Sequence, residues 1–270
     1  MKTQIIETFH AIKKHQPLVH NITNFVVMNN TANALLAIGA SPVMAHAKQE
    51  LDEMVSHCAS LVINMGTLDK RWLKSMHKAS QAANRLEKNW VFDPVGVGAT
   101  EYRTKSAIEL IEDNSPSVLR ANASEIMALA KMQILTKGVD STTSSEAAVE
   151  AAQKLVGLYH TTVAVSGKTD LIISDAGCTK VHTGAEIMTQ VTGMGCTATA
   201  IVGACLGITN NAHLAAVAAM AIMGVCGEVA MQNSKGPGSF QIAFIDSLYN
   251  LSAEKLGEML RIEHESFTQS

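Results

Sequence analysis

Residues 90–99 read Trp-Val-Phe-Asp-Pro-Val-Gly-Val-Gly-Ala, a short apolar run that ends on an acidic residue and continues into a glycine-containing loop. Similar β-rich runs recur along the chain, with segments of helical periodicity between them: Pro42–His46, Leu61–Asn64, Val118–Arg120 and Val163–Ser166. This alternation predicts an α/β fold with a mostly parallel sheet and helices on both faces. Because the carboxyl ends of parallel strands share one rim, we expect ligands to bind there.

Caps and turn residues place further elements around this sheet. A first helix, about Thr3–Lys14, stops before Pro17, and a second, Val26–Ile38, ends at Gly39. The later segments predict a hairpin and three helices: Asp170–Ser174 with Thr179–Thr183, then Cys196–Gly207, Ala212–Met231 and about 240–262. No linker-like segment divides the chain, so we expect one domain over residues 1–270.

The bulk composition argues against several classes of protein. The net charge is -3 with Lys and Arg scattered singly, so no basic stripe predicts nucleic-acid binding. The apolar run Ala212–Gly227 contains His213 and falls short of the roughly 20 residues of a membrane span, so a buried helix is predicted instead. Five cysteines without a CxxC spacing indicate neither a disulfide framework nor a zinc site, which favours a reducing cytoplasm.

The segment 191–197, Val-Thr-Gly-Met-Gly-Cys-Thr, leads from a predicted strand into an apolar helix. Glycines allow a ligand to approach the backbone, and the unpaired amides of a helix start favour an anion such as phosphate. Cys196 lies where the helix field would favour a thiolate, which could accept a proton from an attacking alcohol. A cysteine in an Ala-rich helix can equally be a small buried apolar residue.

Two acidic residues follow predicted strands. Asp93 precedes a glycine loop that is neither a P-loop nor a dinucleotide-binding fingerprint, and it could simply cap the next helix. Glu125 stands three residues after Asn122, so the pair could form an ordinary capping box. If both carboxylates lie on the ligand rim, they offer the hard oxygen ligands that Mg²⁺ takes beside phosphates.

Asn24 and Met44 each end a short segment, in Leu18–Asn24 and in residues 39–46. A polar amide and a polarizable thioether could line a pocket for a small sulfur heterocycle. They could equally be a turn asparagine and a core methionine. His20 and His46 are better explained as structural than as catalytic residues.

Five motifs in order are similar to those of the hydroxyethylthiazole kinase family: LVHNITNFVVMN, GASPVMAHA, DPVGVGAT, NASEI and TGxGC. The resemblance covers nearly the whole chain. It implies a three-layer α/β/α ribokinase-like fold and a homotrimer with active sites at subunit interfaces. It also implies transfer of the ATP γ-phosphoryl group to the hydroxyl of 4-methyl-5-(2-hydroxyethyl)thiazole, a precursor of thiamine, with Mg²⁺ as cofactor.

The resemblance also assigns residues. It implies substrate contacts at Met44, Gly193 and Asn24, ATP contacts at Arg120 and Ser166, and magnesium-associated roles for Asp93 and Glu125. Cys196 stands where sugar kinases of the wider superfamily carry an aspartate base. The sequence departs from the family pattern at Met194, Ala121 and Asn30.

Other functions fit parts of this pattern. A kinase for hydroxymethylpyrimidine or a vitamin B6 vitamer would share the fold, although Cys196 in place of Asp and the HNITN segment argue against it. A nucleotide-dependent dehydratase would hydrolyse ATP without phosphorylating a thiazole. A non-catalytic sensor of a thiamine precursor would bind without turnover, and a cysteine hydrolase would need a local signature that the sequence lacks.

Overall fold

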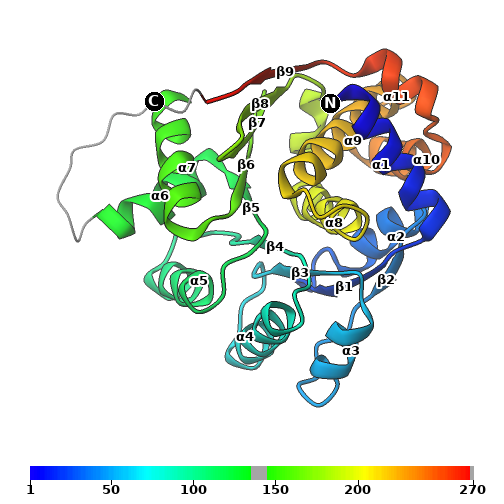
Figure 1. Cartoon of the computed structure of the whole chain (residues 1–270). Helices are drawn as coiled ribbons and strands as arrows, with labels where there is room; N and C mark the ends of the chain where they lie inside the picture. Colours follow the sequence, from blue (N-terminus) through cyan, green and yellow to red (C-terminus); the bar gives the residue numbers. More distant parts are fainter. Residues whose placement is uncertain (135–144, 268–270) are drawn as a thin grey trace.

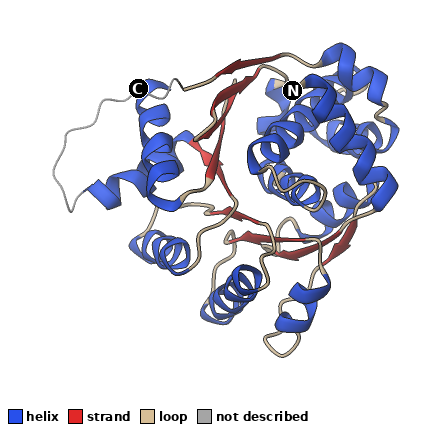
Figure 2. Ribbon diagram, in the orientation of Figure 1, coloured by secondary structure: helices blue, strands red, loops and turns tan. Residues whose placement is uncertain are grey.

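One sheet forms the centre of the molecule, in a computed structural model that describes residues 1–134 and 145–267. Nine strands of these residues take the order β2-β1-β3-β4-β5-β6-β7-β8-β9. The first six run parallel and the last three antiparallel (Figure 2). The strands are β1 (Leu18–Ile22), β2 (Ser41–Val43), β3 (Ser60–Asn64), β4 (Trp90–Asp93), β5 (Val118–Asn122), β6 (Thr162–Ser166), β7 (Asp170–Ser174), β8 (Gly177–Val181) and β9 (Ile262–Glu265).

Helices cover both faces of the sheet, as the alternating pattern predicts (Figure 1). One face carries α3 (Leu51–His57), α4 (Lys70–Arg85), α5 (Glu101–Asp113), α6 (Ala123–Ile134) and α7 (Ser145–Tyr159). The other carries α1 (Lys2–His15), α2 (Met28–Ile38), α8 (Met194–Leu206), α9 (Ala212–Gln232), α10 (Pro237–Asn250) and α11 (Ala253–Met259). The result is a three-layer α/β/α arrangement.

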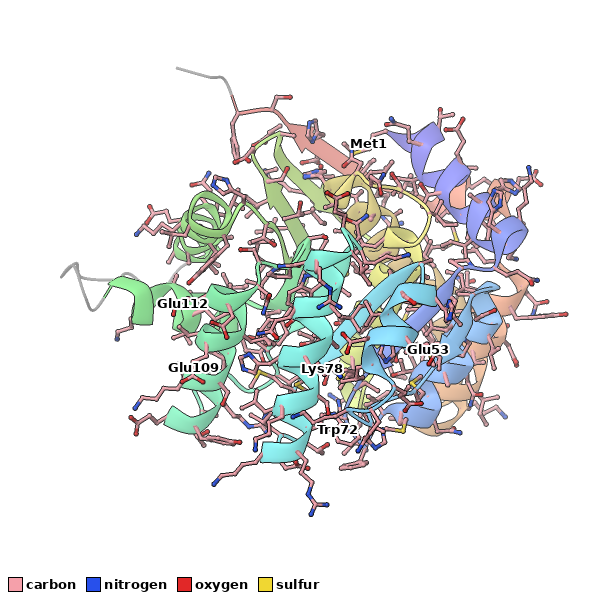
Figure 3. The ribbon with its side chains drawn as sticks, turned by 60° about the horizontal axis from the view of Figure 1, so that its bottom comes forward. Met1, Glu53, Trp72, Lys78, Glu109 and Glu112 are labelled. Atoms are coloured by element: carbon pink, nitrogen blue, oxygen red, sulfur yellow. The ribbon has the colours of Figure 1, made fainter. Side chains whose placement is uncertain are left out.

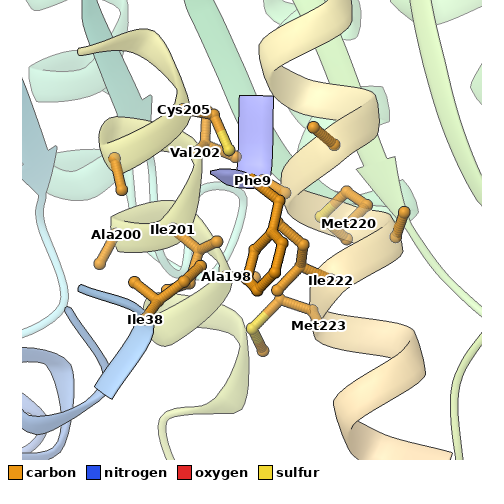
Figure 4. Packing of buried hydrophobic residues seen from close by; sticks show 14 of the residues in the cluster. Phe9, Ile38, Ala198, Ala200, Ile201, Val202, Cys205, Met220, Ile222 and Met223 are labelled. Carbon is orange, nitrogen blue, oxygen red and sulfur yellow. The ribbon is translucent and has the colours of Figure 1, made fainter. Parts of the chain in front are cut away.

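The layer built around α8 and α9 is packed from small and branched side chains. Figure 4 shows Phe9 of α1 between residues of α8 and α9, among them Ile201 and Ile222. Gly203 lets α8 approach the sheet, since a Cβ there would lie 2.4 Å from Val62 Cγ2. Helix α9 is long and apolar enough to cross a membrane, but 78% of its most apolar window is buried. It is therefore a core helix, as the sequence predicts.

Apart from Pro42–His46, the expected strands and the hairpin are found within about two residues of their predicted ends, and Trp90–Asp93 matches at both ends. Other expectations are wrong. The single helix expected at 240–262 is two helices and a strand, because Ser252 caps α11 with its side chain and β9 pairs with β8. A short 3-10 helix, Glu186–Gln190, precedes Gly193 where a strand was expected. The expected strand Pro42–His46 ends at Val43, which leaves Met44 in a loop.

Candidate active site

Five neighbouring parallel strands bring the candidate polar residues to one rim. Asn24 follows β1, Asn64 ends β3, Asp93 ends β4, Arg120 lies near the end of β5 and Ser166 ends β6. In the sheet these strands are adjacent in the order β1, β3, β4, β5, β6. The start of α8 reaches the same rim, since Thr199 and Cys196 bond to side chains of these loops and strands.

The start of α8 offers unpaired amides at this rim. Gly193 precedes the helix in the left-handed region with φ 88°, and no side chain caps the helix. Among the described residues, no hydrogen bond takes up the backbone amides of Met194, Gly195 or Cys196. A Cβ on Gly195 would lie 2.8 Å from Arg120 Nη1, so glycine here admits the guanidinium. Free amides and an arginine together have the donors and the positive charge that an anion requires.

Asp93 is buried beneath these amides, with 1% of its surface exposed. Its Oδ2 accepts hydrogen bonds from Asn64 Nδ2 at 2.8 Å and from Thr199 Oγ1 at 2.7 Å. Burial raises the pKa of Asp93 to about 6, while Arg120 and the Thr199 hydrogen bond act in the opposite direction. The arginine and the two hydrogen bonds thus favour the ionised carboxylate, which is a hard oxygen ligand.

Arg120 is the positive charge of the site and is only 8% exposed. Its Nη1 lies 3.7 Å from Asp93 Oδ2, which is an ion pair at long range. Its Nε is buried and has no hydrogen-bond partner within residues 1–134 and 145–267. A buried guanidinium with an unused donor is costly unless a ligand completes its bonding, and a phosphate group has the required charge and acceptors.

Glu125 joins two loops of the rim. One oxygen accepts the amide of Asn122 at 3.0 Å, and Asn122 Oδ1 accepts the amide of Glu125 at 2.9 Å, so the capping box is confirmed. The other oxygen accepts the amide of Gly96 at 2.8 Å, within the glycine loop after Asp93. Each carboxylate oxygen keeps a further lone pair, which is enough to receive a magnesium-bound water.

Cys196 is half-buried in the first turn of α8, and Asn24 Nδ2 lies 3.4 Å from its Sγ. Burial, followed by the charge of Asp93, raises the pKa of the Cys196 thiol, while the amides of Asn64 and Asn24 and the charge of Arg120 lower it. The net direction is opposite to the thiolate expected from the helix field alone. Burial therefore disfavours the thiolate, which is the form of Cys196 that could accept a proton.

A cavity of about 810 Å³ opens beside Arg120. Its polar wall includes Ser166, whose hydroxyl otherwise makes one long contact of 3.5 Å to the carbonyl of Ala121. The other lining residues include Lys168, Asp170, Met194, Gly195, Ala198, Met220 and Met223. A large cavity whose lining combines charged and apolar side chains suits a nucleotide.

Met44 and Asn24 lie on neighbouring loops, because β2 and β1 are adjacent and parallel. Met44 is half-buried. The loop that carries Met44 is held by a hydrogen bond of 2.7 Å between His20 Nε2 and the carbonyl of Ala45. Trp72, at the start of α4 (Figure 3), donates its indole N–H to the carbonyl of Thr23 at 3.1 Å and so fixes the loop of Asn24. Neither Met44 nor Asn24 is among the residues that line the 810 Å³ cavity.

Residues 9–254 match the profile of the Hydroxyethylthiazole kinase family. This chain belongs to that family. Hydroxyethylthiazole kinases of Brachyspira hyodysenteriae and Syntrophus aciditrophicus are 51% and 49% identical to it, over 93% of this chain and 95% and 94% of theirs.

Solved structures agree with the family assignment. The hydroxyethylthiazole kinase protein of Pyrococcus horikoshii superimposes with a TM-score of 0.91 and 39% identity, covering 98% of this chain and 100% of that one. A ribokinase-like superfamily protein from Enterococcus faecalis, at 13% identity, has a TM-score of 0.62 and covers 92% of this chain and 94% of that chain. At that identity the likeness shows the fold alone, which is the ribokinase-like fold expected.

The family motifs leave out three polar residues that the structure places at this hydroxyethylthiazole kinase site. Asn64 and Thr199 are buried and bond to Asp93, while Asp170 lines the cavity and accepts the amide of Gly167 at 3.0 Å. Burial raises the pKa of Asp170 to about 6. A sequence signal existed for Asn64, which ends a predicted apolar strand. Thr199 lies three residues after Cys196, within one helical turn.

Proposed function

We propose that this protein transfers the γ-phosphoryl group of ATP to the hydroxyl of 4-methyl-5-(2-hydroxyethyl)thiazole, in the salvage of thiamine, and that residues 1–270 form one kinase domain. Membership of the hydroxyethylthiazole kinase family supports the substrate. The observation that carries the chemistry is the buried Arg120, with an unpaired Nε beside the free amides of α8. Such an arrangement stabilises charge on a transferring phosphoryl group.

The nucleotide would occupy the 810 Å³ cavity with its phosphates toward Arg120 and its base toward the methionines. Ser166 would hydrogen-bond the phosphate chain from the end of β6. The amides of Gly195 and Cys196 would then hold the transferring group, because they are unpaired and face an anion-binding helix start. Phosphoryl transfer through a loose transition state depends mainly on this positioning.

Mg²⁺ fits the acidic residues of the rim. Asp93 and Glu125 supply carboxylate oxygens, and Asp93 Oδ1 has no hydrogen-bond donor among the described residues. When bound, the metal would neutralise charge on the β- and γ-phosphates. The chain's own contribution is to keep Asp93 ionised with two donors and one arginine.

The thiazole would lie between the loops of Asn24 and Met44 and the start of α8, where Gly193 has no side chain to exclude it. Adding a Cβ to Gly193 would also collide with Val27 Cγ1 at 2.5 Å. Cys196 would receive the proton of the hydroxyl only in its thiolate form, because a neutral thiol is not a base. Because its thiol has a raised pKa, proton acceptance contributes little until the bond to phosphorus forms.

We further propose a homotrimer in the cytoplasm, with the thiazole side of the site at a subunit interface. Large apolar side chains are exposed beside Asn24, namely Phe25 at 60% and Val26 at 62%. Helix α10, which packs on α2, exposes Ile242 and Tyr249. Apolar surface of this kind favours association, and light scattering of Tyr249→Glu should show smaller particles than the wild type.

The decisive experiment is mass spectrometry of the thiazole alcohol after incubation with the protein, ATP and Mg²⁺. We expect a gain of one phosphoryl group on the thiazole, with hydroxymethylpyrimidine unmodified in a parallel reaction. Consumption of ATP without a phosphorylated thiazole would reject the proposed reaction and favour a nucleotide-dependent dehydratase.

A further inference from the structure

Asn64 occupies the centre of a buried chain of side chains between Asp93 and Cys196. It is 1% exposed at the end of β3, and its only possible partners are therefore the groups that surround it. Its amide contacts Asp93 on one side and Asn24 on the other. Asn24 in turn reaches the sulfur of Cys196. No motif of the sequence drew attention to Asn64.

Backbone amides settle which way each side-chain amide points. The N–H of Gly66 can only donate, and it lies 3.0 Å from Asn64 Oδ1, so Asn64 Nδ2 faces Asp93. The N–H of Val26 lies 3.1 Å from Asn24 Oδ1 in the same way. Asn24 Nδ2 must then donate to Asn64 Oδ1, at 2.7 Å, and toward Cys196 Sγ. The donor and the acceptor of each hydrogen bond between Asp93, Asn64, Asn24 and Cys196 are therefore fixed.

This directionality has a consequence for Asp93. Its Oδ2 receives Asn64 Nδ2 and the Thr199 hydroxyl, which leaves Oδ1 as the oxygen free for a ligand. A second consequence concerns Cys196, whose sulfur receives an N–H and is thereby oriented as an acceptor. Gly66 adds to this constraint, because a Cβ there would lie 2.6 Å from Asn24 Nδ2. The amide of Asn24 is confined to this position.

We propose that Asn64 is a positioning residue that aligns the two sides of the phosphoryl-transfer site, holding Asp93 directly and Cys196 through Asn24. The kinetic part of this inference rests on the proposed function. The geometric part does not, since the reactivity of the Cys196 thiol, which depends on this hydrogen bonding, can be measured without any substrate. Asn64 itself need not touch a reacting atom, because both its polar atoms are occupied by protein groups.

Alkylation of Cys196 by iodoacetamide, followed by mass spectrometry, tests the geometry. The other four cysteines are buried, so Cys196 is the expected site of reaction. Asn24→Ala removes the N–H that favours the thiolate of Cys196, and Asn64→Ala removes the carbonyl oxygen that holds this N–H in place. Each variant should therefore slow alkylation at about pH 8 by about fivefold or more. Thr199→Val is the matched control, because it removes a hydrogen bond to Asp93 and leaves the amide chain intact. Its alkylation rate should stay within about twofold of wild type.

Turnover provides the second measurement. Misplacement of Asp93 and Cys196 should lower kcat of Asn64→Ala by about tenfold or more, with a smaller change in KM for the thiazole. Unchanged alkylation in Asn64→Ala, or equal slowing in Thr199→Val, would overturn the inference. If Asn64→Ala does not fold by circular dichroism, Asn64→Ser takes its place with the same expected direction. If alkylation follows the expected pattern while wild type phosphorylates no thiazole, the proposed function fails and the positioning role stands.

Discussion

Replacing Gly195 by alanine should impair nucleotide use without harming the fold. Gly195 is the second residue of α8 and has helical geometry, so alanine is compatible with its backbone. The added Cβ would lie 2.8 Å from Nη1 and 3.3 Å from Nη2 of Arg120, and the guanidinium must withdraw. The guanidinium is the end of a flexible side chain, so its displacement requires little rearrangement of the rest of the protein.

The size of the effect follows from the contact that is lost. A hydrogen bond between charged groups contributes about 1.5–3 kcal/mol, and each 1.4 kcal/mol is about tenfold, so kcat/KM for ATP should fall by about ten- to a hundredfold. The free energy of unfolding should stay the same or rise by up to about 1 kcal/mol, because alanine favours helix over glycine. Steady-state kinetics with varied ATP, together with urea unfolding, measure both quantities.

Two controls make this prediction specific. Gly157 lies in α7 with no atom within 4 Å of an added Cβ, so Gly157→Ala should match the stability change and leave kinetics unaltered. In an Arg120→Lys background, Gly195→Ala should add little further loss, because both changes remove the same contact. A folded Gly195→Ala protein with kcat/KM within about twofold of wild type would refute the reasoning.

Five other substitutions test separate parts of the structure. Gly203→Val should lower the free energy of unfolding by about 1–3 kcal/mol, measured by thermal unfolding, because the new side chain collides with the sheet. Burial raises the pKa of Asp170 to about 6. Between about pH 4 and 6 the folded protein therefore keeps a proton on Asp170 that the unfolded chain has released. Above that range Asp170 is ionised in both states, and its buried charge lowers the free energy of unfolding. Asp170→Asn should therefore raise the free energy of urea unfolding at about pH 8 by about 1–3 kcal/mol, and an unchanged value would contradict this. Asp93→Asn and Glu125→Gln should each raise the magnesium concentration for half-maximal activity by about tenfold, and identical titration curves would reject the metal role. Cys196→Ala should slow turnover while ATP affinity, measured by calorimetry, stays close to wild type, and unchanged turnover would exclude proton transfer to the thiol.

The strand ends of this fold can be predicted from the sequence for a physical reason. A buried parallel strand is an apolar run, and its first polar residue marks the rim, as Asn64 and Asp93 do. Strand β1 breaks this rule, because His20 and Asn21 are buried within it and interrupt the apolar pattern. Strand β9, Ile262–Glu265, is exposed and charged, so nothing in its composition separates it from the helix expected there.

The site is less predictable than the fold, because its contacts join distant residues. Thr199 and Asp93 are 106 positions apart, and Asn64 and Asp93 are 29 apart. The sequence could place Asp93 and Glu125 on the rim, but not the burial that raises the pKa of Asp93. For Cys196, the helix start predicted a lowered pKa, whereas burial and the charge of Asp93, neither of which can be read from the local sequence, raise it.

The two outer strands of the sheet bear on how this protein avoids aggregation. Strand β2 has three residues and includes Pro42, which has no N–H to offer to an incoming strand. At the opposite border, β9 carries Glu263 and Glu265. If the β9 strand of a second copy paired with it, the glutamates of the two strands would repel each other. Neither border can template the growth of a continuous β-ribbon between molecules.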